Sequence, residues 1–239
     1  MSEDILSIYR TWLQWCPIND DLAALQEEAV MEWAGAGRTG ENALEIAKSA
    51  IVRAEDLIAV FERDQPLPRP IVCRAGCSVC CCNQAELTPV EALLLGDYVA
   101  RHLSMEDKTR LAARLARNLR IKAGKDKKEI MALRYKLPCP LLLAGRCSVY
   151  PARPLLCRAA HSLNADICRQ EIISPVSGFE FYSHRYEIAL SVIAGLKAGC
   201  LALGCQFRAL DLARAMHDFF QAENPVEDWI QGKAVFSEK

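Results

Sequence analysis

Apolar residues recur at helical spacing over most of the chain. Before residue 64 they form three stripes, at 5–13, 22–33 and 44–61, in which apolar positions repeat every three or four residues. Such stripes are typical of amphipathic helices that bury one face. The sequence therefore predicts helices through most of residues 3–63.

Helix starts are marked by residues that can cap a helix. Asn19 or Asp20 can cap the second helix. The clearest start is Thr88-Pro-Val-Glu91, with Thr as the N-cap, Pro at the first helical position and an acid in the first turn. Ser104 can begin another helix, in which leucines follow at positions 111, 115 and 119.

The end of the chain is also expected to be helical. Apolar stripes predict helices at 179–196 and 203–220, and Asn224 before a proline can cap a last short helix. No stretch alternates between apolar and polar residues for long enough to predict more than a very short strand. We therefore expect a mainly α protein.

A proline-rich segment divides the chain. Residues 64–70 contain three prolines, which stop a helix and favour an extended connector. We expect an N-terminal helical segment at 1–64 and a cysteine-rich part with C-terminal helices at 65–239, which together could form one compact unit. A hydrophobic fraction of 51% and a charged fraction of 25% are those of an ordinary globular protein.

The N-terminus and the apolar runs indicate a cytoplasmic protein without a membrane span. The first residues lack the basic segment followed by an apolar segment that is typical of a signal peptide. The longest apolar runs are far too short to cross a bilayer. The chain has twelve cysteines, which should stay reduced in the cytoplasm. Clustered reduced thiols predict metal binding or redox chemistry rather than a disulfide framework.

The chemically distinctive stretch is 73–82, in which five of ten residues are cysteine. Packing does not call for so many thiols, whereas soft metals and iron–sulfur clusters prefer thiolate ligands. Cys77 and Cys80 form a Cys-x-x-Cys pair, which can direct two thiolates at one ion. Structural zinc sites take about four ligands, so partners are expected elsewhere in the chain.

Those partners are expected in a second region, where Cys139, Cys147 and Cys157 lie among prolines and a Gly-Arg turn. Loops can fold several ligands onto one ion, which a straight helix cannot. A first site could combine Cys77 and Cys80 with two of these three cysteines. Cys73 and Cys81 are in reserve to complete a cluster or to bind a second ion. The remaining cysteines are expected to be small buried hydrophobic residues: Cys16, Cys82, Cys168, Cys200 and Cys205.

Several motifs in these regions resemble the CxxCxxCC family, also called YkgJ-like proteins, which chelate zinc or iron through a cysteine cluster. The resemblance covers roughly residues 70–170, and the motifs occur in the family's order. They are Leu87-Thr88-Pro-Val-Glu91, Cys139-Pro-Leu-Leu142, Cys147-Ser-Val-Tyr150 and Arg153-Pro-Leu-Leu-Cys157-Arg158. Cys77, Cys80 and Cys81 fit the family's first cluster. Three residues separate Cys73 from Cys77 where the family has two, and Cys82 is an extra cysteine.

The resemblance implies a helical protein in which two cysteine-rich loops enclose a zinc or iron site, either a single ion or an iron–sulfur cluster. The implied metal ligands are Cys73, Cys77, Cys80, Cys81, Cys139, Cys147 and Cys157. Flagellin lysine N-methylases look similar in the same region, which makes an iron–sulfur enzyme with redox or methyl-transfer activity an alternative. The sequence shows no Gly-rich loop for a methyl donor and names no reaction, catalytic residue or protein partner.

Four other residues near the cysteines have two interpretations each. His161 follows Cys157 at a spacing that could place both on one ion, although a lone histidine is more often structural. Arg153 and Arg158 could offset thiolate charge or form a surface pair. Glu91 could simply favour the positive end of its helix.

The region 101–136 is basic, with twelve Lys or Arg against four Asp or Glu in a chain whose net charge is −1. Arg110, Arg114 and Arg117 could line one helix face. Such a face could bind nucleic acid, but no aromatic residues interleave with these three arginines, and a solvated helix face is the preferred interpretation. Nucleic-acid binding is thus a minor alternative.

Overall fold

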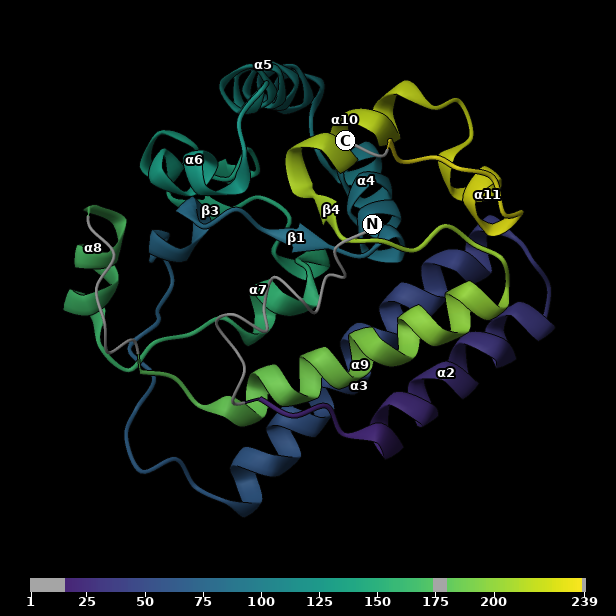
Figure 1. Ribbon diagram of the computed structural model, residues 1–239, viewed down its shortest axis with the longest axis horizontal. Helices are drawn as coiled ribbons and strands as arrows, with labels where there is room; N and C mark the ends of the chain where they lie inside the picture. The colour runs from purple at the N-terminus through teal and green to yellow at the C-terminus, as the bar shows by residue number, and fades with distance from the viewer. Residues whose placement is uncertain (1–15, 174–179, 238–239) are drawn as a thin grey trace.

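The computed structural model describes residues 16–173 and 180–237 and is mainly helical, as the sequence predicts (Figure 1). The first predicted helix, at 5–13, lies outside the described residues. The helices are α2 (Asp20–Gly35), α3 (Gly40–Asp64), α4 (Pro89–His102), α5 (Met105–Lys122), α6 (Lys127–Ala132), α7 (Leu155–Ala159), α8 (Ala165–Ile173), α9 (Ser183–Ala202), α10 (Leu212–Gln221) and α11 (Pro225–Ile230).

Short strands and 3₁₀ turns connect these helices. Two antiparallel pairs of two-residue strands are formed, β1 (Glu86–Leu87) with β4 (Leu210–Asp211) and β2 (Leu142–Leu143) with β3 (Arg146–Cys147). The 3₁₀ turns are η1 (Val79–Cys82), η2 (Arg134–Lys136) and η3 (Tyr150–Ala152). The cysteine-rich regions lie mainly in these short elements and the loops between them.

The predicted caps at the starts of three helices are confirmed. The side chain of Asn19 accepts a hydrogen bond from the backbone N–H of Leu22 at 2.9 Å, and Ser104 caps α5 in the same way. Thr88 and Glu91 form a capping box at the start of α4, with Pro at the first helical position. Asn224 precedes α11 but makes no side-chain cap.

The predicted helices at the end of the chain have wrong boundaries. α9 begins at Ser183 and runs on to Ala202, and α10 begins only at Leu212 rather than at 203. Gly204, with φ of +71°, ends α9, because this left-handed conformation suits glycine. Leu210 is buried and pairs with Leu87 in a strand, so its apolar side chain extends the stripe without being helical.

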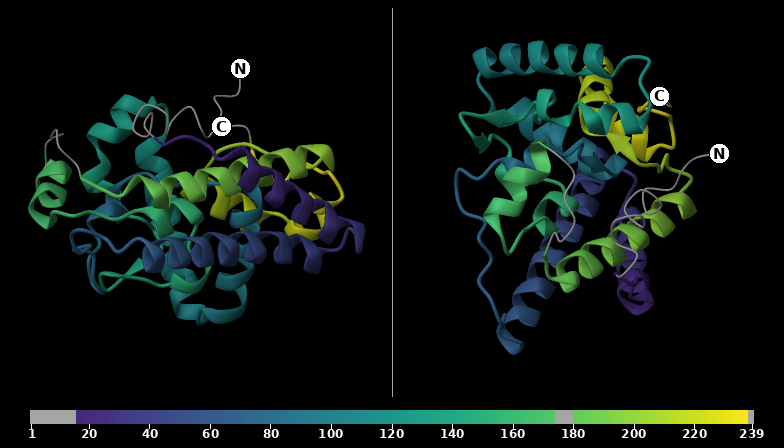
Figure 2. Two further views of the ribbon diagram at one scale, coloured as in Figure 1. Left: turned by 90° about the horizontal axis from the view of Figure 1, so that it is seen from below. Right: turned by 60° about the vertical axis from the view of Figure 1, so that its left-hand side comes forward.

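Helices α2, α3 and α9 lie side by side and form one layer of the molecule (Figures 1 and 2). α2 and α9 approach closely at Gly195, where a Cβ would lie 2.2 Å from the backbone oxygen of Ala23. Gly199 makes a similar close contact with Val30. Glycine is therefore needed at these positions so that the two helices can pack.

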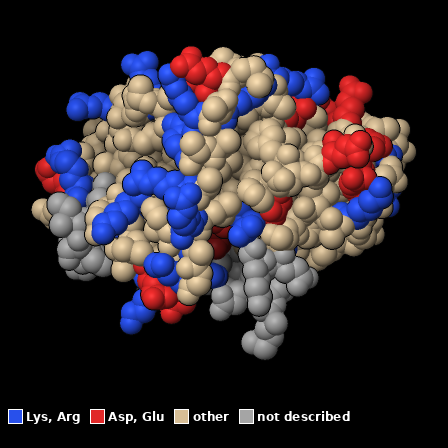
Figure 3. All heavy atoms as spheres, turned by 90° about the horizontal axis from the view of Figure 1, so that it is seen from above, with Lys and Arg blue, Asp and Glu red and all other residues tan. Residues whose placement is uncertain are grey.

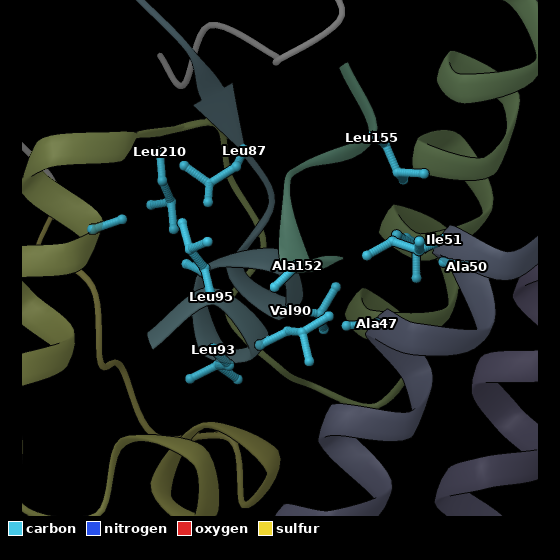
Figure 4. Close-up of a cluster of buried hydrophobic side chains, with 14 of the residues drawn as sticks. Ala47, Ala50, Ile51, Leu87, Val90, Leu93, Leu95, Ala152, Leu155 and Leu210 are labelled. Carbon is cyan, nitrogen blue, oxygen red and sulfur yellow. The ribbon is translucent and has the colours of Figure 1, made fainter. Parts of the chain in front are cut away.

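Helix α4 lies between this layer and α10. Its first two turns are buried on all sides, as expected for a central helix. In Figure 4, Val90 of α4 lies towards Ala47 and Ile51 of α3, and Leu210 lies beside Leu87 on the other side. α7 packs against α9 at the edge of the same core.

The N-terminal helices share this core with the rest of the chain. Ala47 and Ile51 belong to the same buried cluster as Leu155 and Leu196. The proline-rich segment after α3 thus connects two parts that are packed together. Within the described residues, no helix is both long enough and apolar enough to cross a membrane.

Candidate metal centre

The first cysteine region is a series of tight turns. Backbone hydrogen bonds run from Cys77 N–H to the carbonyl of Arg74 at 2.9 Å and from Cys81 N–H to Ser78 at 3.1 Å. Cys80 and Cys81 lie in the 3₁₀ turn η1, in which successive side chains point about 120° apart, since three residues complete a turn. Adjacent cysteines therefore cannot all face one ion, and ligands from elsewhere are needed.

The second cysteine region lies directly against the first. The N–H of Cys139 donates to the carbonyl of Cys81 at 2.7 Å. The side-chain amide of Gln84 donates to the carbonyls of both Cys82 and Leu137, at 3.2 Å each. These bonds bring together segments more than 50 residues apart, so the expectation that the two regions meet is confirmed.

Cys147 is held beside Cys139 by a hairpin. Strand β2 begins three residues after Cys139, and Leu142 pairs with Cys147 across the hairpin. Ala144 and Gly145 form the turn with φ of 48° and 74°, which closes the hairpin tightly. The hairpin thus returns the chain to the neighbourhood that Cys139 occupies.

Helix α7, which carries Cys157, is anchored by the buried carboxylate of Glu91. Oε1 of Glu91 accepts from the N–H of Leu155 at 2.6 Å, and Oε2 accepts from the N–H and the hydroxyl of Thr88 at 2.7 and 2.8 Å. Burial raises the pKa of Glu91, and these hydrogen bonds oppose the rise. Glu91 therefore does more than favour its own helix terminus. It ties the first turn of α4 to the first turn of α7.

Arg158 organises the loop before α7. It is buried, and its guanidinium donates to the carbonyl of Arg153 at 2.7 Å and to that of Pro151 at 2.6 Å. It also forms an ion pair with Glu55 of α3. The alternative of a surface pair is therefore wrong for Arg158. Arg153 stacks on the ring of Tyr150, with its central carbon 4.1 Å from the ring centroid.

Four thiols from the two regions influence one another. Burial raises the pKa of Cys157, and the neighbouring Cys139, Cys80 and Cys147 raise it further. Burial likewise raises the pKa of Cys139 to about 11, with a further contribution from Cys147. The pKa of Cys80 is raised first by a hydrogen bond with Cys81 and then by burial. Such mutual effects require the thiols to be near one another.

Positive charge lies close to the same thiols. Burial raises the pKa of Cys147, while a backbone hydrogen bond, Arg153 and Arg158 lower it. Arg153 also lowers the pKa of Cys80. Arg153 and Arg158 are thus near enough to these thiols to favour their thiolate forms.

Cys73, Cys77 and Cys80 are exposed residues at the edge of this neighbourhood. Partial burial of its sulfur raises the pKa of Cys73, and Cys77, Cys80 and Cys168 add to the rise. α8, which contains Cys168, packs against η1. Cys168 is half-buried, as is Cys82, so the prediction that both are buried hydrophobic residues is wrong. The short distance in sequence between Cys168 and Cys157 could have indicated that Cys168 lies near the cysteine regions.

Several predicted structural residues are confirmed. Cys16, Cys200 and Cys205 are buried, as expected for small hydrophobic residues. His161 is buried, and both its ring nitrogens are occupied. Nδ1 lies 2.7 Å from the carbonyl of Ala159, and Nε2 accepts from the N–H of Tyr182 at 2.8 Å. With no nitrogen free, His161 has a structural role in this conformation rather than that of a metal ligand.

The donors fit a soft metal, but they do not form a closed site as they stand. In the two described ranges, no three Cys, His, Asp or Glu side chains are grouped closely enough to hold an ion. Cys80 and Cys147 lie in a 3₁₀ turn and a hairpin, whereas Cys157 lies in the helix α7. Comparisons of the chain with known protein families, with characterised proteins and with solved structures gave no match.

Proposed function

We propose that this protein is a cytoplasmic metal-binding protein in which both cysteine regions contribute thiolate ligands to a zinc or iron site. The observation that supports it best is the backbone hydrogen bond between Cys139 and Cys81, which joins the two regions. Around that bond lie Cys80, Cys147 and Cys157, the other thiols of the mutually interacting group. Thiolates are preferred ligands of both zinc and iron.

The anchors around the thiols support a ligand role. Glu91 and Arg158 fix the backbone that leads into Cys157 without using the thiol itself. Partners that orient the ligand-bearing segments are characteristic of metal sites, where they contribute to affinity. A bound metal would cross-link the hairpin, α7 and η1, and its binding free energy would add to the stability of the fold.

The proposal predicts that Cys157→Ala lowers both metal content and thermal stability. The matched control is Cys200→Ala, which also removes a buried thiol from a helix but lies outside the cysteine regions. Metal content per chain is measured by elemental analysis of purified protein, and stability by thermal unfolding with and without a chelator. We expect Cys157→Ala to lose metal and to become insensitive to the chelator, whereas Cys200→Ala keeps its metal.

Unchanged metal content in Cys157→Ala, or equal loss in both variants, would contradict the proposal. A protein that contains no metal after anaerobic purification and does not bind added zinc or iron would also contradict it.

A second candidate function is that of an iron–sulfur enzyme with redox or methyl-transfer activity. The surplus of thiols favours it, since Cys73, Cys77 and Cys81 adjoin the four thiols described above. Such a cluster would supply electron transfer. Anaerobically purified protein should then be brown and should bleach on reduction. A colourless protein that contains only zinc would exclude this alternative.

A further inference from the structure

The surroundings of Cys157 disfavour the thiolate that a metal ligand must provide. Burial raises the pKa of this thiol, and the negative charges that Cys139, Cys80 and Glu91 carry when ionised raise it further. All of these influences oppose ionisation. A thiolate at Cys157 therefore needs a hydrogen-bond donor close to its sulfur.

Two of the other thiols in the group already have such a donor. Burial raises the pKa of Cys139, but a backbone hydrogen bond with Leu141 opposes the rise. In the same way, a backbone hydrogen bond with Val149 opposes the effect of burial on the pKa of Cys147. In the described part of the chain, no hydrogen bond is among the main influences on Cys157. Its donor must come from another element.

The basic face of the molecule does not supply this donor. Figure 3 views the side of the molecule on which α5 lies, and Lys and Arg side chains gather on part of that face. Arg110 of α5 pairs with Glu106, and Arg114 donates to the carbonyl of Leu142 at 2.7 Å. Both arginines are thus engaged by other groups, and neither is among the main influences on Cys157.

Tyr186 lies on the helix that packs against the one carrying Cys157. It is in the first turn of α9, and α9 packs against α7 (Figure 1). Its ring lies against that of His161, with the centroids 6.1 Å apart, and meets the ring of Phe181 edge-on at 5.2 Å. His161 is itself held by two backbone hydrogen bonds. These contacts fix the direction of the Tyr186 ring.

The hydroxyl of Tyr186 lies near the thiols and is free to donate. Burial raises its pKa, and Cys80 and Cys157 raise it further, so the oxygen is close to both sulfurs and stays protonated at neutral pH. Within 16–173 and 180–237, this hydroxyl forms no hydrogen bond. It is also not one of the fully enclosed polar atoms there that lack a partner, so it keeps some accessible surface.

We propose that Tyr186 is a positioning residue of the metal centre, whose hydroxyl donates a hydrogen bond to the metal-bound thiolate of Cys157. This inference rests on the proposed metal-binding function. A tyrosine hydroxyl can donate to sulfur while it remains neutral, so it stabilises the thiolate without adding a charge to the buried site. Hydrogen bonds to ligand sulfur tune metal affinity and, in iron–sulfur clusters, the reduction potential.

Cobalt(II) titration of the full chain under anaerobic conditions tests this proposal. Cobalt(II) is the probe because thiolate sites bind it, and its thiolate complexes absorb light by charge transfer from sulfur to metal. We expect Tyr186→Phe to bind cobalt(II) at least about tenfold more weakly than the wild-type chain. Its charge-transfer band should also move to longer wavelength, because a sulfur that has lost a hydrogen bond gives up an electron more easily.

Tyr182→Phe is the matched control. The ring of Tyr182 also stacks on His161, with centroids 5.8 Å apart, but its hydroxyl donates to the carbonyl of Arg69 at 2.7 Å. This variant therefore removes a hydroxyl from the same aromatic cluster without removing a donor to a thiol. It should keep the cobalt(II) affinity and the band position of the wild-type chain.

Three outcomes would overturn the inference and leave the proposed function intact. The first is wild-type affinity in Tyr186→Phe, and the second is an equal loss of affinity in both variants. The third is weaker binding by Tyr186→Phe with an unmoved charge-transfer band, because that result would indicate a packing role alone. If the wild-type chain bound no cobalt(II), the proposed function and this inference would both be overturned.

Discussion

Replacement of Glu91 by Ala should destabilise the protein far more than the loss of an ordinary helix cap. Glu91 is 2% exposed, and its carboxylate accepts three hydrogen bonds, two from Thr88 and one from Leu155. A buried donor without a partner costs about 1–3 kcal/mol. Loss of all three hydrogen bonds therefore costs about 3 kcal/mol or more, and removal of a buried carboxylate offsets part of that cost. We expect a net loss of about 2–4 kcal/mol.

The chain contains a matched control for this prediction. Asp126 and Glu129 form a second capping box at the start of α6, in which Glu129 accepts from the N–H of Asp126 at 2.8 Å. Both residues of that box are exposed. Glu129→Ala should cost about 0.5–1 kcal/mol, because water replaces the lost acceptor.

Both free energies of unfolding can be measured by urea titration, monitored by the circular dichroism signal of the helices. Glu91→Gln should give an intermediate loss, because the amide keeps one oxygen but presents N–H groups to the donors on its other side. The same variants should be assayed for metal content, since Glu91 positions the helix that carries Cys157. If Glu91→Ala cost no more than Glu129→Ala, the anchoring role that we assign to Glu91 would be refuted.

Two further predictions concern the layer of long helices. Gly195→Ala should lower the free energy of unfolding by about 1–3 kcal/mol, because the new Cβ would lie 2.2 Å from the backbone oxygen of Ala23. A Cβ at Gly35 would meet no atom within 4 Å, so Gly35→Ala should be neutral or stabilising. Thermal unfolding of both variants measures the difference. Hydrogen bonds from Arg185 at 2.6 and 2.8 Å lower the pKa of Glu62. The ionised Glu62 therefore stabilises the fold fully above the unfolded pKa of about 4.3. This stabilisation is lost as the pH falls through the lower pKa of the folded state. Glu62→Gln should therefore be less stable than wild type at neutral pH and equally stable in strong acid, and a difference that does not change with pH in urea unfolding would contradict this account.

The local features of the fold could be predicted because a few neighbouring residues determine them. Asn19, Thr88 and Ser104 cap helices through hydrogen bonds to residues three positions away, and such short-range patterns are visible in the sequence. The start of α10 was misplaced for a long-range reason. Leu210 is buried in a strand that pairs with Leu87, so it is apolar without being helical, and no local pattern contains that information.

The candidate site shows the same division between local and long-range information. The sequence indicates which cysteines are grouped, because a cluster of thiols is unusual anywhere in a chain. It does not show that Glu91 reaches Leu155, which is 64 residues away, or that Arg158 bonds to backbone carbonyls. It also leaves His161 with two interpretations, because the ring nitrogens are occupied by backbone groups only in the folded chain.

The anchors also indicate what a bound metal would change. The side chains of Gln84, Glu91 and Arg158 form hydrogen bonds with backbone groups of the cysteine-bearing segments. Through Glu91 and Arg158, these segments are connected to helices that belong to one large core. Small zinc-finger domains unfold without their metal because they have no such core. Here the hydrophobic core should keep the helices folded when the metal is removed. Metal loss should therefore loosen the turns around Cys80 and Cys147 and lower the melting temperature, while most of the helical structure is retained.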